Sequence, residues 1–253
     1  MSISQDSMWL LKEKYDGVKS DAFYADVKRL AMGEPLGYII GHVPFLNTTI
    51  HLDSRPLIPR AETEFWVEKA IDEIKSKNIP SPHILDLCAG SGCIGVSVAK
   101  KIPSAQVDFS EIEIDHIETI KKNLTENDIP ENHYNVVHTS LFDKLPTKYN
   151  FILSNPPYID ETLNRVDHSV IDFEPHLALF GGQDGMEVIT NIIEKAINHL
   201  HPQGQLWMEH EPEQTEIITE LAEKNLYTIT THRDQYGTER YSKLVYDLNF
   251  KES

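Results

Sequence analysis

The sequence predicts an α/β protein with a mostly parallel β-sheet, and three observations lead to this fold class. Short apolar runs alternate with amphipathic segments from residue 62 to residue 225, which is the pattern of βαβ units. The first of these runs ends in a turn rich in glycine, the place where open α/β sheets bind ligands. The last two strand-like runs have no helix between them, so we expect them to pair antiparallel.

The N-terminal part of the chain predicts a small helical segment followed by a β-hairpin. Residues 5–15 and 21–32 show helical spacing of apolar side chains, and Ser20 or Asp21 can cap the second helix. A break in this pattern at residues 33–38 precedes short β-like runs separated by turn residues. The predicted parts are a helical segment (1–37), a hairpin linker (38–58) and a large α/β domain (59–253).

The large domain reads as a regular succession of helices and strands. Each helix has an apolar stripe at a spacing of three or four residues, and each strand is a short run of apolar or β-branched side chains. The predicted strands are residues 83–88, 106–112, 135–140, 149–155, 204–210, 227–233 and 240–248. The predicted helices are residues 62–78, 94–102, 115–127, 185–200 and 212–225.

Composition excludes several classes of protein. Two cysteines in 253 residues are too few for a disulfide scaffold or a thiolate zinc site, and no histidine spacing is diagnostic of a metal. No run of about 18 apolar residues is present, so we expect no membrane span. The N-terminus lacks a basic start followed by an apolar stretch, so we expect no signal peptide, a cytoplasmic location and, by default, a monomer.

The net charge is −17 and is unevenly distributed. Residues 1–60 hold seven basic and seven acidic side chains, so residues 61–253 hold the remaining 16 basic and 33 acidic side chains. Such a surface repels phosphate backbones, because nucleic-acid affinity depends on Lys and Arg neutralising phosphates. The charge indicates either a basic partner or only the acidic composition that many soluble proteins have.

A first candidate site follows the first strand of the domain. Asp86 stands at the strand end, glycines at 90, 92 and 95 follow, and Glu111 ends the second strand. Glycine lets backbone N–H groups approach a ligand, and a carboxylate at the end of the second strand can hold two ribose hydroxyls. Nucleotide dehydrogenases and S-adenosylmethionine (SAM) enzymes share this arrangement. The other candidates for the ribose carboxylate are Asp108, Glu113 and Asp115, the last of which resembles a helix N-cap.

A second candidate site follows the strand at 149–155. This strand ends in Asn155-Pro156-Pro157-Tyr158. The two prolines have no N–H, so their region offers carbonyl acceptors, Asn155 adds an amide oxygen and Tyr158 adds a flat ring. A planar NH2 group needs two acceptors and a face to lie on. The motif therefore predicts a site that aims such a nitrogen at an electrophile.

Together the two motifs resemble the class I SAM-dependent methyltransferases that act on exocyclic or amide nitrogens. Three further stretches are similar to the protein-(glutamine N5) methyltransferases of the PrmC/HemK family, which act on peptide chain release factors. The similarity covers about residues 8–248. The stretches are residues 33–45 with PLIPRAETE at 56–64, residues 172–189, and residues 204–214 leading to YGTER at 236–240.

This resemblance implies a Rossmann-like, mostly parallel sheet of seven strands, SAM as cofactor and S-adenosylhomocysteine as product. The implied substrate is the glutamine of the release-factor Gly-Gly-Gln motif, and residues 1–37 are the implied recognition segment. The implied SAM-binding residues are Cys88, Ala89, Gly90, Ser91, Gly92, Glu111, Leu141 and Asn155. The implied substrate-binding residues are Asn155, Pro156, Pro157 and Tyr158, of which Asn155, Pro156 and Tyr158 are catalytic.

Four features depart from the family pattern. Cys88 replaces the first glycine of the turn, Glu111 stands where Asp is common, Ser140 replaces an acidic residue, and the N-terminal segment is about half the usual length. We expect the departure at Cys88 to do little harm, because cysteine is small.

The sequence leaves open the roles of several loop residues and three alternative functions. Glu174 and the GGQDG loop (181–185) either order the active site or are structural, and Arg60 with Glu62 either positions the hairpin or forms surface ion pairs. The alternatives are a nucleic-acid amino-methyltransferase (adenine N6 or guanine N2), a non-catalytic SAM-binding partner of release factors, and an NAD-dependent dehydrogenase. The acidic charge opposes the first, and the intact Asn-Pro-Pro-Tyr motif opposes the other two.

Overall fold

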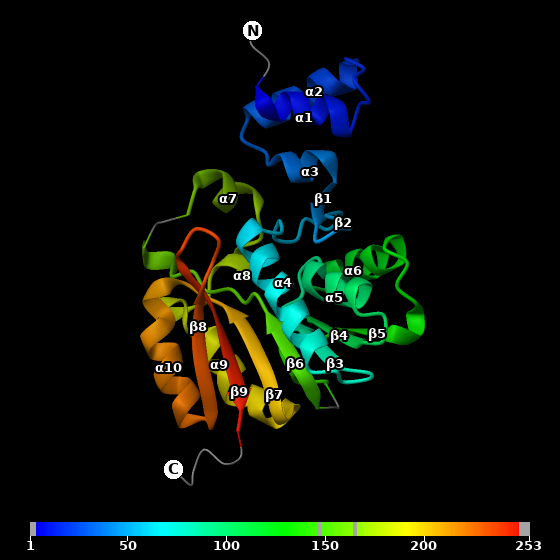
Figure 1. Cartoon of the computed structure of the whole chain (residues 1–253). Helices are drawn as coiled ribbons and strands as arrows, with labels where there is room; N and C mark the ends of the chain where they lie inside the picture. The colour runs from blue at the N-terminus through cyan, green and yellow to red at the C-terminus, as the bar shows by residue number, and fades with distance from the viewer. Residues whose placement is uncertain (1–3, 146–147, 164–165, 248–253) are drawn as a thin grey trace.

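The computed structural model describes residues 4–145, 148–163 and 166–247, and its centre is a seven-stranded mixed sheet (Figure 1). The first five strands in sheet order are parallel, and the last two pair antiparallel, as predicted. This confirms the fold class. In sheet order the strands are β5 (Tyr134–His138), β4 (Gln106–Glu111), β3 (His83–Leu87), β6 (Tyr149–Ser154), β7 (Leu200–Glu209), β9 (Glu239–Tyr246) and β8 (Tyr227–Arg233).

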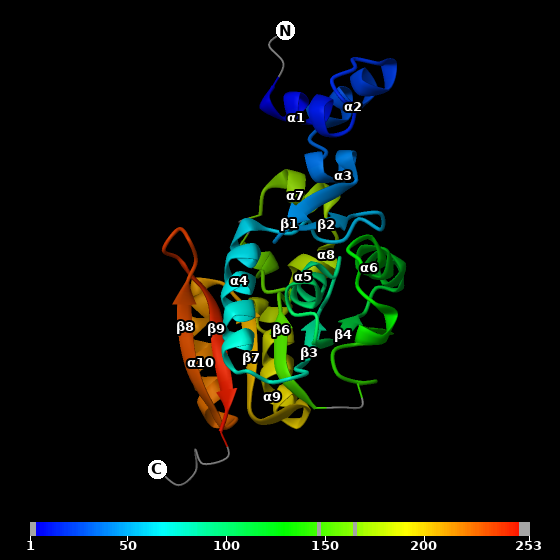
Figure 2. The same cartoon turned by 45° about the vertical axis from the view of Figure 1, so that its right-hand side comes forward.

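Helices cover both faces of this sheet (Figures 1 and 2). Ile84 and Phe151 belong to the apolar core shared with the first three helices of the domain, whereas their neighbours Leu85 and Ile152 belong to the core shared with the last two. Central strands buried on both faces explain why they read as continuous apolar runs and not as alternating ones. The helices are α4 (Ala61–Ser76), α5 (Cys93–Lys101) and α6 (Ile114–Glu126) on one face, and α9 (Glu187–Ala196) and α10 (Thr215–Lys224) on the other.

The N-terminal helices α1 (Gln5–Glu13) and α2 (Asp21–Ala31) lie beyond the hairpin, away from the large sheet (Figure 2). The Ser20 hydroxyl accepts a hydrogen bond from the Phe23 N–H at 3.2 Å, so Ser20 is the N-cap of α2. Leu10, Phe23 and Ile39 form a small apolar core of their own. These helices therefore pack mainly on each other and on the segment that follows them.

Residues 36–40 correct the expectation of a broken pattern running into a β-like stretch. They form a short helix, α3 (Leu36–Ile40), with Pro35 at its N-cap and Gly41 in the left-handed conformation at its end. Proline fits the start of a helix because it has no N–H to satisfy, and glycine ends a helix without strain. Five residues are too few to show a helical period, so the apolar Tyr38, Ile39 and Ile40 resembled a strand.

The hairpin expected within residues 38–58 is present as β1 (His42–Phe45) and β2 (Thr48–His51). Its two turn residues, Leu46 and Asn47, both have positive φ, as a two-residue turn of type I′ requires. Asn123 of α6 and Asn127 at the C-cap of that helix bond the backbone of β2 through both their amide oxygens and nitrogens. The hairpin is thereby attached to the large domain.

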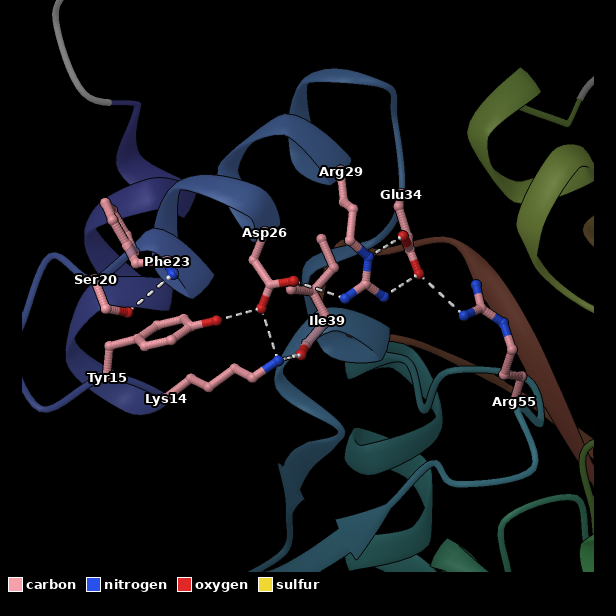
Figure 3. Close-up of polar contacts among 9 residues, drawn as sticks. All are labelled: Lys14, Tyr15, Ser20, Phe23, Asp26, Arg29, Glu34, Ile39 and Arg55. Atoms are coloured by element: carbon pink, nitrogen blue, oxygen red, sulfur yellow. Dashed lines mark hydrogen bonds and ion pairs between the residues drawn. The ribbon is translucent and has the colours of Figure 1, made fainter.

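An ion-pair chain joins the N-terminal helices to the segment after the hairpin (Figure 3). Arg29 bonds Asp26 and makes two bonds of 2.7 Å to Glu34, and Glu34 also accepts from Arg55 at 3.0 Å. Lys14 and Tyr15 both donate to the other oxygen of Asp26 at 2.7 Å. The chain of charges sets the direction in which the helices leave the hairpin.

The other differences from the predicted elements are small. The segment between β6 and α9 contains short helices where only loop was expected, and β7 begins at Leu200, four residues early. Leu248, the last residue of the predicted closing strand, lies outside the described residues. In the part that is described, no helix is long and apolar enough to cross a membrane. The short helices between β6 and α9 are η2 (Glu161–Leu163), α7 (His168–Phe173), α8 (His176–Leu179) and η3 (Gln183–Gly185). Elsewhere in the domain are η1 (Glu131–His133), η4 (Ile197–His199) and η5 (Pro212–Gln214).

Candidate active site

Both motifs lie at one edge of the sheet, beyond the carboxyl ends of β3, β4, β6 and β7. The chain moves from β3 outward to β4 and β5 and then returns to the other side of β3 as β6. Such a reversal opens a crevice between the loops, and ligands of open α/β sheets bind there. The topology therefore brings together the glycine turn at 88–92 and residues 155–158.

The glycine turn has the backbone shape that the sequence indicated. Gly90 and Gly92 both have positive φ, and a Cβ added to Gly90 would meet no atom within 4 Å. Gly95 has a different purpose, since a Cβ there would lie 2.3 Å from the ring of Phe109. The open space over Gly90 is thus available to a ligand, whereas Gly95 lets α5 pack on β4.

The expectation that Cys88 does little harm stays a prediction, but the structure shows that this position has a conformational cost. Its φ is +61°, a left-handed conformation in which a non-glycine residue costs about 1–2 kcal/mol. The cost arises from the Cβ and the backbone, so the small size of the side chain does not remove it. Burial raises the pKa of the Cys88 thiol to about 12, so the group is not a reactive thiolate.

Glu111 is buried at the end of β4 and bonds the glycine turn. One carboxylate oxygen accepts from the Gly90 N–H at 2.6 Å and the other from the Glu113 N–H at 2.8 Å. The other candidates are less well placed. Asp108 lies inside the strand and accepts from the Tyr149 hydroxyl, and Asp115 is in the first turn of α6, whose N-cap is Glu113.

Asp86 is fully buried below the turn. One of its oxygens accepts from the Gly95 N–H at 2.8 Å, and the other has no partner among the described residues. Burial raises the pKa of this carboxyl to about 8, and the nearby Glu111 charge adds to the effect. Asp86 therefore holds its proton at neutral pH in the ligand-free protein.

This raised pKa predicts a specific pH dependence of stability. Between about pH 4 and pH 8 the native state keeps the Asp86 proton while the unfolded state has lost it, so stability falls as the pH rises. We expect the urea midpoint of the ligand-free protein to decrease from pH 5 to pH 8 more steeply than that of an Asp86→Asn variant. Parallel curves for the two proteins would show that Asp86 is already ionised in the native state.

Two cavities meet at Asn155. One has a volume of about 150 Å³ and is lined by the glycine turn and Glu111; the other has a volume of about 360 Å³ and is lined by Pro156, Tyr158 and the loop after them. Asn155, Leu57 and Ala178 line both. A group held in one cavity can therefore face a group held in the other, with the Asn155 side chain at the junction.

A buried carboxylate that the sequence did not single out connects the side chains of the second motif. Glu209, at the end of β7, accepts from the Tyr158 hydroxyl at 2.8 Å and from the Thr63 hydroxyl at 2.7 Å. Trp66 Nε1 also donates to Glu209, and the Asn155 amide nitrogen donates to the Thr63 oxygen at 3.2 Å. Burial raises the pKa of Glu209, and the three donors oppose this shift.

The loop GGQDG lies directly behind the second motif. A Cβ on Gly181 would lie 2.6 Å from the Pro157 carbonyl oxygen, and one on Gly185 would lie 2.0 Å from the Tyr158 carbonyl oxygen. Gln214 donates to the same Tyr158 oxygen at 2.8 Å. Of the two interpretations of this loop, the structure supports ordering of the site: glycines let the loop support the backbone of residues 157–158.

Glu174 and Arg60 join two segments that border the cavities. The Glu174 side chain is 1% exposed and accepts from Arg60 at 2.6 Å and from the Ile58 N–H at 3.0 Å. The pair connects the start of α4 to the loop between α7 and α8. Arg60 therefore has the positioning contact that the sequence left open, while no such contact is found for Glu62 among the described residues.

We expect Arg60→Ala to destabilise the protein by about 1–3 kcal/mol, because it leaves the buried Glu174 carboxylate without its cation. Arg233→Ala is the matched control, since Arg233 pairs with Glu239 at the surface and such pairs contribute about 0–1 kcal/mol. Urea unfolding of both variants measures the difference. Adding Glu174→Gln to Arg60→Ala should recover stability, and equal losses for the two single variants would contradict the assignment.

The remaining expected residues are placed as follows. Ala89, Ser91 and Pro157 line the smaller cavity, whereas Leu141 does not. Leu141 has positive φ, and its carbonyl accepts from the hydroxyl of Ser110, the neighbour of Glu111. No group of His, Cys, Asp and Glu side chains suited to a metal occurs in the described ranges.

Known proteins resemble this chain in sequence and in fold. Residues 70–172 match the family model "Methyltransferase small domain". The release factor glutamine methyltransferase of Rhodopirellula baltica is 36% identical over 209 residues, which are 81% of this chain and 70% of the relative. That of Bifidobacterium longum is 34% identical over 87% of this chain and 78% of the relative. The catalytic domain of human METTL16 superposes with a TM-score of 0.60 over 80% of this chain and 76% of that one; at 17% identity this likeness concerns the fold alone.

Proposed function

The chain belongs to the release factor glutamine methyltransferase family, and we propose that residues 155–158 hold the substrate glutamine against the methyl group of SAM. The enzyme is a SAM-dependent protein-glutamine methyltransferase that acts on release factors. This membership removes the dehydrogenase alternative. The observation that supports the site assignment is the meeting of the two cavities at Asn155.

The residues that line the smaller cavity suit the cofactor. Gly90 offers open space, and the Glu111 carboxylate accepts from the Gly90 and Glu113 N–H groups at a place where two ribose hydroxyls could become its donors instead. SAM supplies the electrophilic methyl group. We propose that residues 88–92, Glu111 and Asn155 bind it and that Leu141, beside the end of β4, packs on the adenine.

The larger cavity fits the glutamine side chain. An amide nitrogen is a weak nucleophile because its lone pair is delocalised into the carbonyl. Asn155 Oδ1 and the Pro156 carbonyl oxygen would accept its two hydrogens, which draws electron density onto the nitrogen and directs it along the line of displacement. As the nitrogen–methyl bond forms and the sulfur–methyl bond breaks, the nitrogen would become strongly acidic and release one of these hydrogens as a proton to water. The Tyr158 ring would hold the amide plane. Preorganised dipoles and proximity then provide the main contributions to the rate.

Recognition of the release factor would involve the N-terminal segment and the surface charge. Residues 1–37 include exposed apolar side chains (Met8, Trp9, Tyr24 and Met32) suited to a protein partner. The net charge of −17 on residues 61–253 favours a basic face on the release factor. We further propose a cytoplasmic monomer, which cell fractionation and analytical ultracentrifugation would test.

The deciding experiment is methyl transfer from labelled SAM to a release factor and to its Gly-Gly-Gln→Gly-Gly-Ala variant, with DNA and rRNA as controls. We expect label on the unaltered factor alone, at a rate that decreases as salt is raised. Label on nucleic acid alone would show that the substrate is a nucleic acid and not a release factor. Binding of SAM without any methyl transfer would indicate a binding protein. A rate that salt does not change would remove the charge argument only.

A further inference from the structure

We propose that Thr63 and Glu209 are positioning residues that fix which end of the Asn155 side-chain amide, Oδ1 or Nδ2, points at the substrate. The proposal rests on the function proposed above, because it assigns a cause to the orientation of Asn155. Neither residue belongs to the glycine turn or to the Asn-Pro-Pro-Tyr motif. They reach the site from the first turn of α4 and from the end of β7.

The direction of each hydrogen bond follows from the chemistry of the groups. An ionised carboxylate only accepts, and the Trp66 indole N–H only donates. Glu209 Oε2 receives both Trp66 Nε1 and the Thr63 hydroxyl, each at 2.7 Å. Thr63 has one hydroxyl hydrogen and gives it to Glu209. Toward Asn155, therefore, the Thr63 oxygen can only accept.

This constraint determines the orientation of Asn155. The Thr63 oxygen accepts from Asn155 Nδ2 at 3.2 Å, which turns the amide nitrogen toward the start of α4 and leaves Oδ1 on the opposite side of the amide. An acceptor at that position suits a substrate NH2 group. Without Thr63 as acceptor the amide could turn over, and its own NH2 would then face the NH2 of the substrate, two donors with nothing to accept.

Glu209 holds Tyr158 in the same way. Its other oxygen accepts from the Tyr158 hydroxyl at 2.8 Å, so one carboxylate fixes both the acceptor and the flat ring of the motif. Glu209 is 1% exposed, and burying a carboxylate destabilises a fold unless its hydrogen bonds compensate. Glu209 bonds Tyr158 directly and Asn155 through Thr63. Packing alone does not require a buried carboxylate with these bonds, so we assign it a role in positioning the two side chains.

The test compares substitutions at Thr63 that differ only in the hydroxyl. We expect Thr63→Val, which keeps the shape, to lower kcat for release-factor methylation about 10- to 100-fold with a small change in KM. Thr63→Ser restores the hydroxyl and should recover most of that loss. Trp66→Phe is the control, because it removes a donor from the same Glu209 oxygen but leaves the bonds to Thr63 and Tyr158. Its melting temperature should fall while kcat changes less than about threefold.

Substitutions of Glu209 test whether this carboxylate positions Thr63 and Tyr158. In Glu209→Gln, the Trp66 N–H keeps the amide oxygen on the Thr63 side, so only the Tyr158 bond reverses and the loss of kcat should be smaller than for Thr63→Val. Glu209→Ala removes both links, and the double variant with Thr63→Val should lose no more than the larger single loss. If Glu209→Ala does not fold, the Thr63 pair and Glu209→Gln still decide.

Equal kcat for Thr63→Val and Thr63→Ser would overturn the proposal, as would a greater loss for Glu209→Gln than for Thr63→Val. Equilibrium binding of SAM to each variant separates a cofactor defect from a defect in transfer. An unsubstituted enzyme without release-factor methylation would instead contradict the proposed function, so the two failures are distinguishable.

Discussion

Asn155→Ala is expected to lower kcat for release-factor methylation about 10²- to 10³-fold, the usual cost of removing one preorganised polar group from a reacting centre. The alanine variant lacks the Oδ1 acceptor at the junction of the two cavities. The substrate amide would then keep only the Pro156 carbonyl as acceptor, and its nitrogen would no longer be aimed. The measurement is single-turnover transfer of labelled methyl with enzyme in excess.

Two comparisons make this result interpretable. Asn191→Ala is the matched control, since Asn191 is partly exposed on α9 and, among the described residues, its side-chain amide donates to the Glu187 carbonyl; its rate should equal that of the unsubstituted enzyme. The rise in melting temperature on adding SAM should persist in Asn155→Ala, although Asn155 also lines the cofactor cavity. Transfer within about threefold of the unsubstituted rate would exclude Asn155 as the acceptor.

The sequence predicted the parts of the site that are continuous in the chain. The glycine turn follows β3 directly, and Asn155 follows β6 directly, so a strand prediction and a short motif are enough to place them. The meeting of the two motifs could also be inferred, because parallel strands carry their carboxyl ends to one edge. The order of the central strands follows the same rule.

The parts that the sequence missed depend on contacts between distant residues. Thr63 and Glu209 are 146 positions apart, and Arg60 and Glu174 are 114 apart. A Thr in the first turn of a helix and a Glu at a strand end are both ordinary at the surface, so only folding reveals that they are buried together. The signal available was Glu209 ending an otherwise apolar strand, since such a carboxylate needs buried donors.

The short helix α3 shows a different limit. Its five residues hold Tyr38, Ile39 and Ile40 in succession, and β-branched and aromatic side chains favour strands. The punctuation by Pro35 and Gly41 was a better guide than the side chains between them. Helix ends leave a signal even where a helix is too short to show its period.

Gly185→Ala should both destabilise the fold and slow the reaction. A methyl group at Gly185 would lie 2.0 Å from the Tyr158 carbonyl oxygen and 2.7 Å from Gln214 Nε2, at a φ of +67°. The left-handed conformation costs about 1–2 kcal/mol and the forced displacement about 1–3 kcal/mol more. For a protein of this size each kcal/mol lowers the melting temperature by roughly 2–4 °C.

Gly237→Ala separates these two causes. Gly237 has a φ of +83° in the turn between β8 and β9, and a Cβ there would meet no atom within 4 Å, so its alanine variant shows the backbone cost alone. The excess loss in Gly185→Ala measures the displacement of residues 157–158. Because a shift of about 1 Å in a positioned group can reduce the rate about 10²-fold, kcat should fall in Gly185→Ala and stay unchanged in Gly237→Ala.

Equal melting temperatures and equal rates for the two variants would mean that the GGQDG loop gives way and does not support Tyr158. The expected result would instead explain the first and last glycines of the loop, Gly181 and Gly185, by the room that the backbone of residues 157–158 requires.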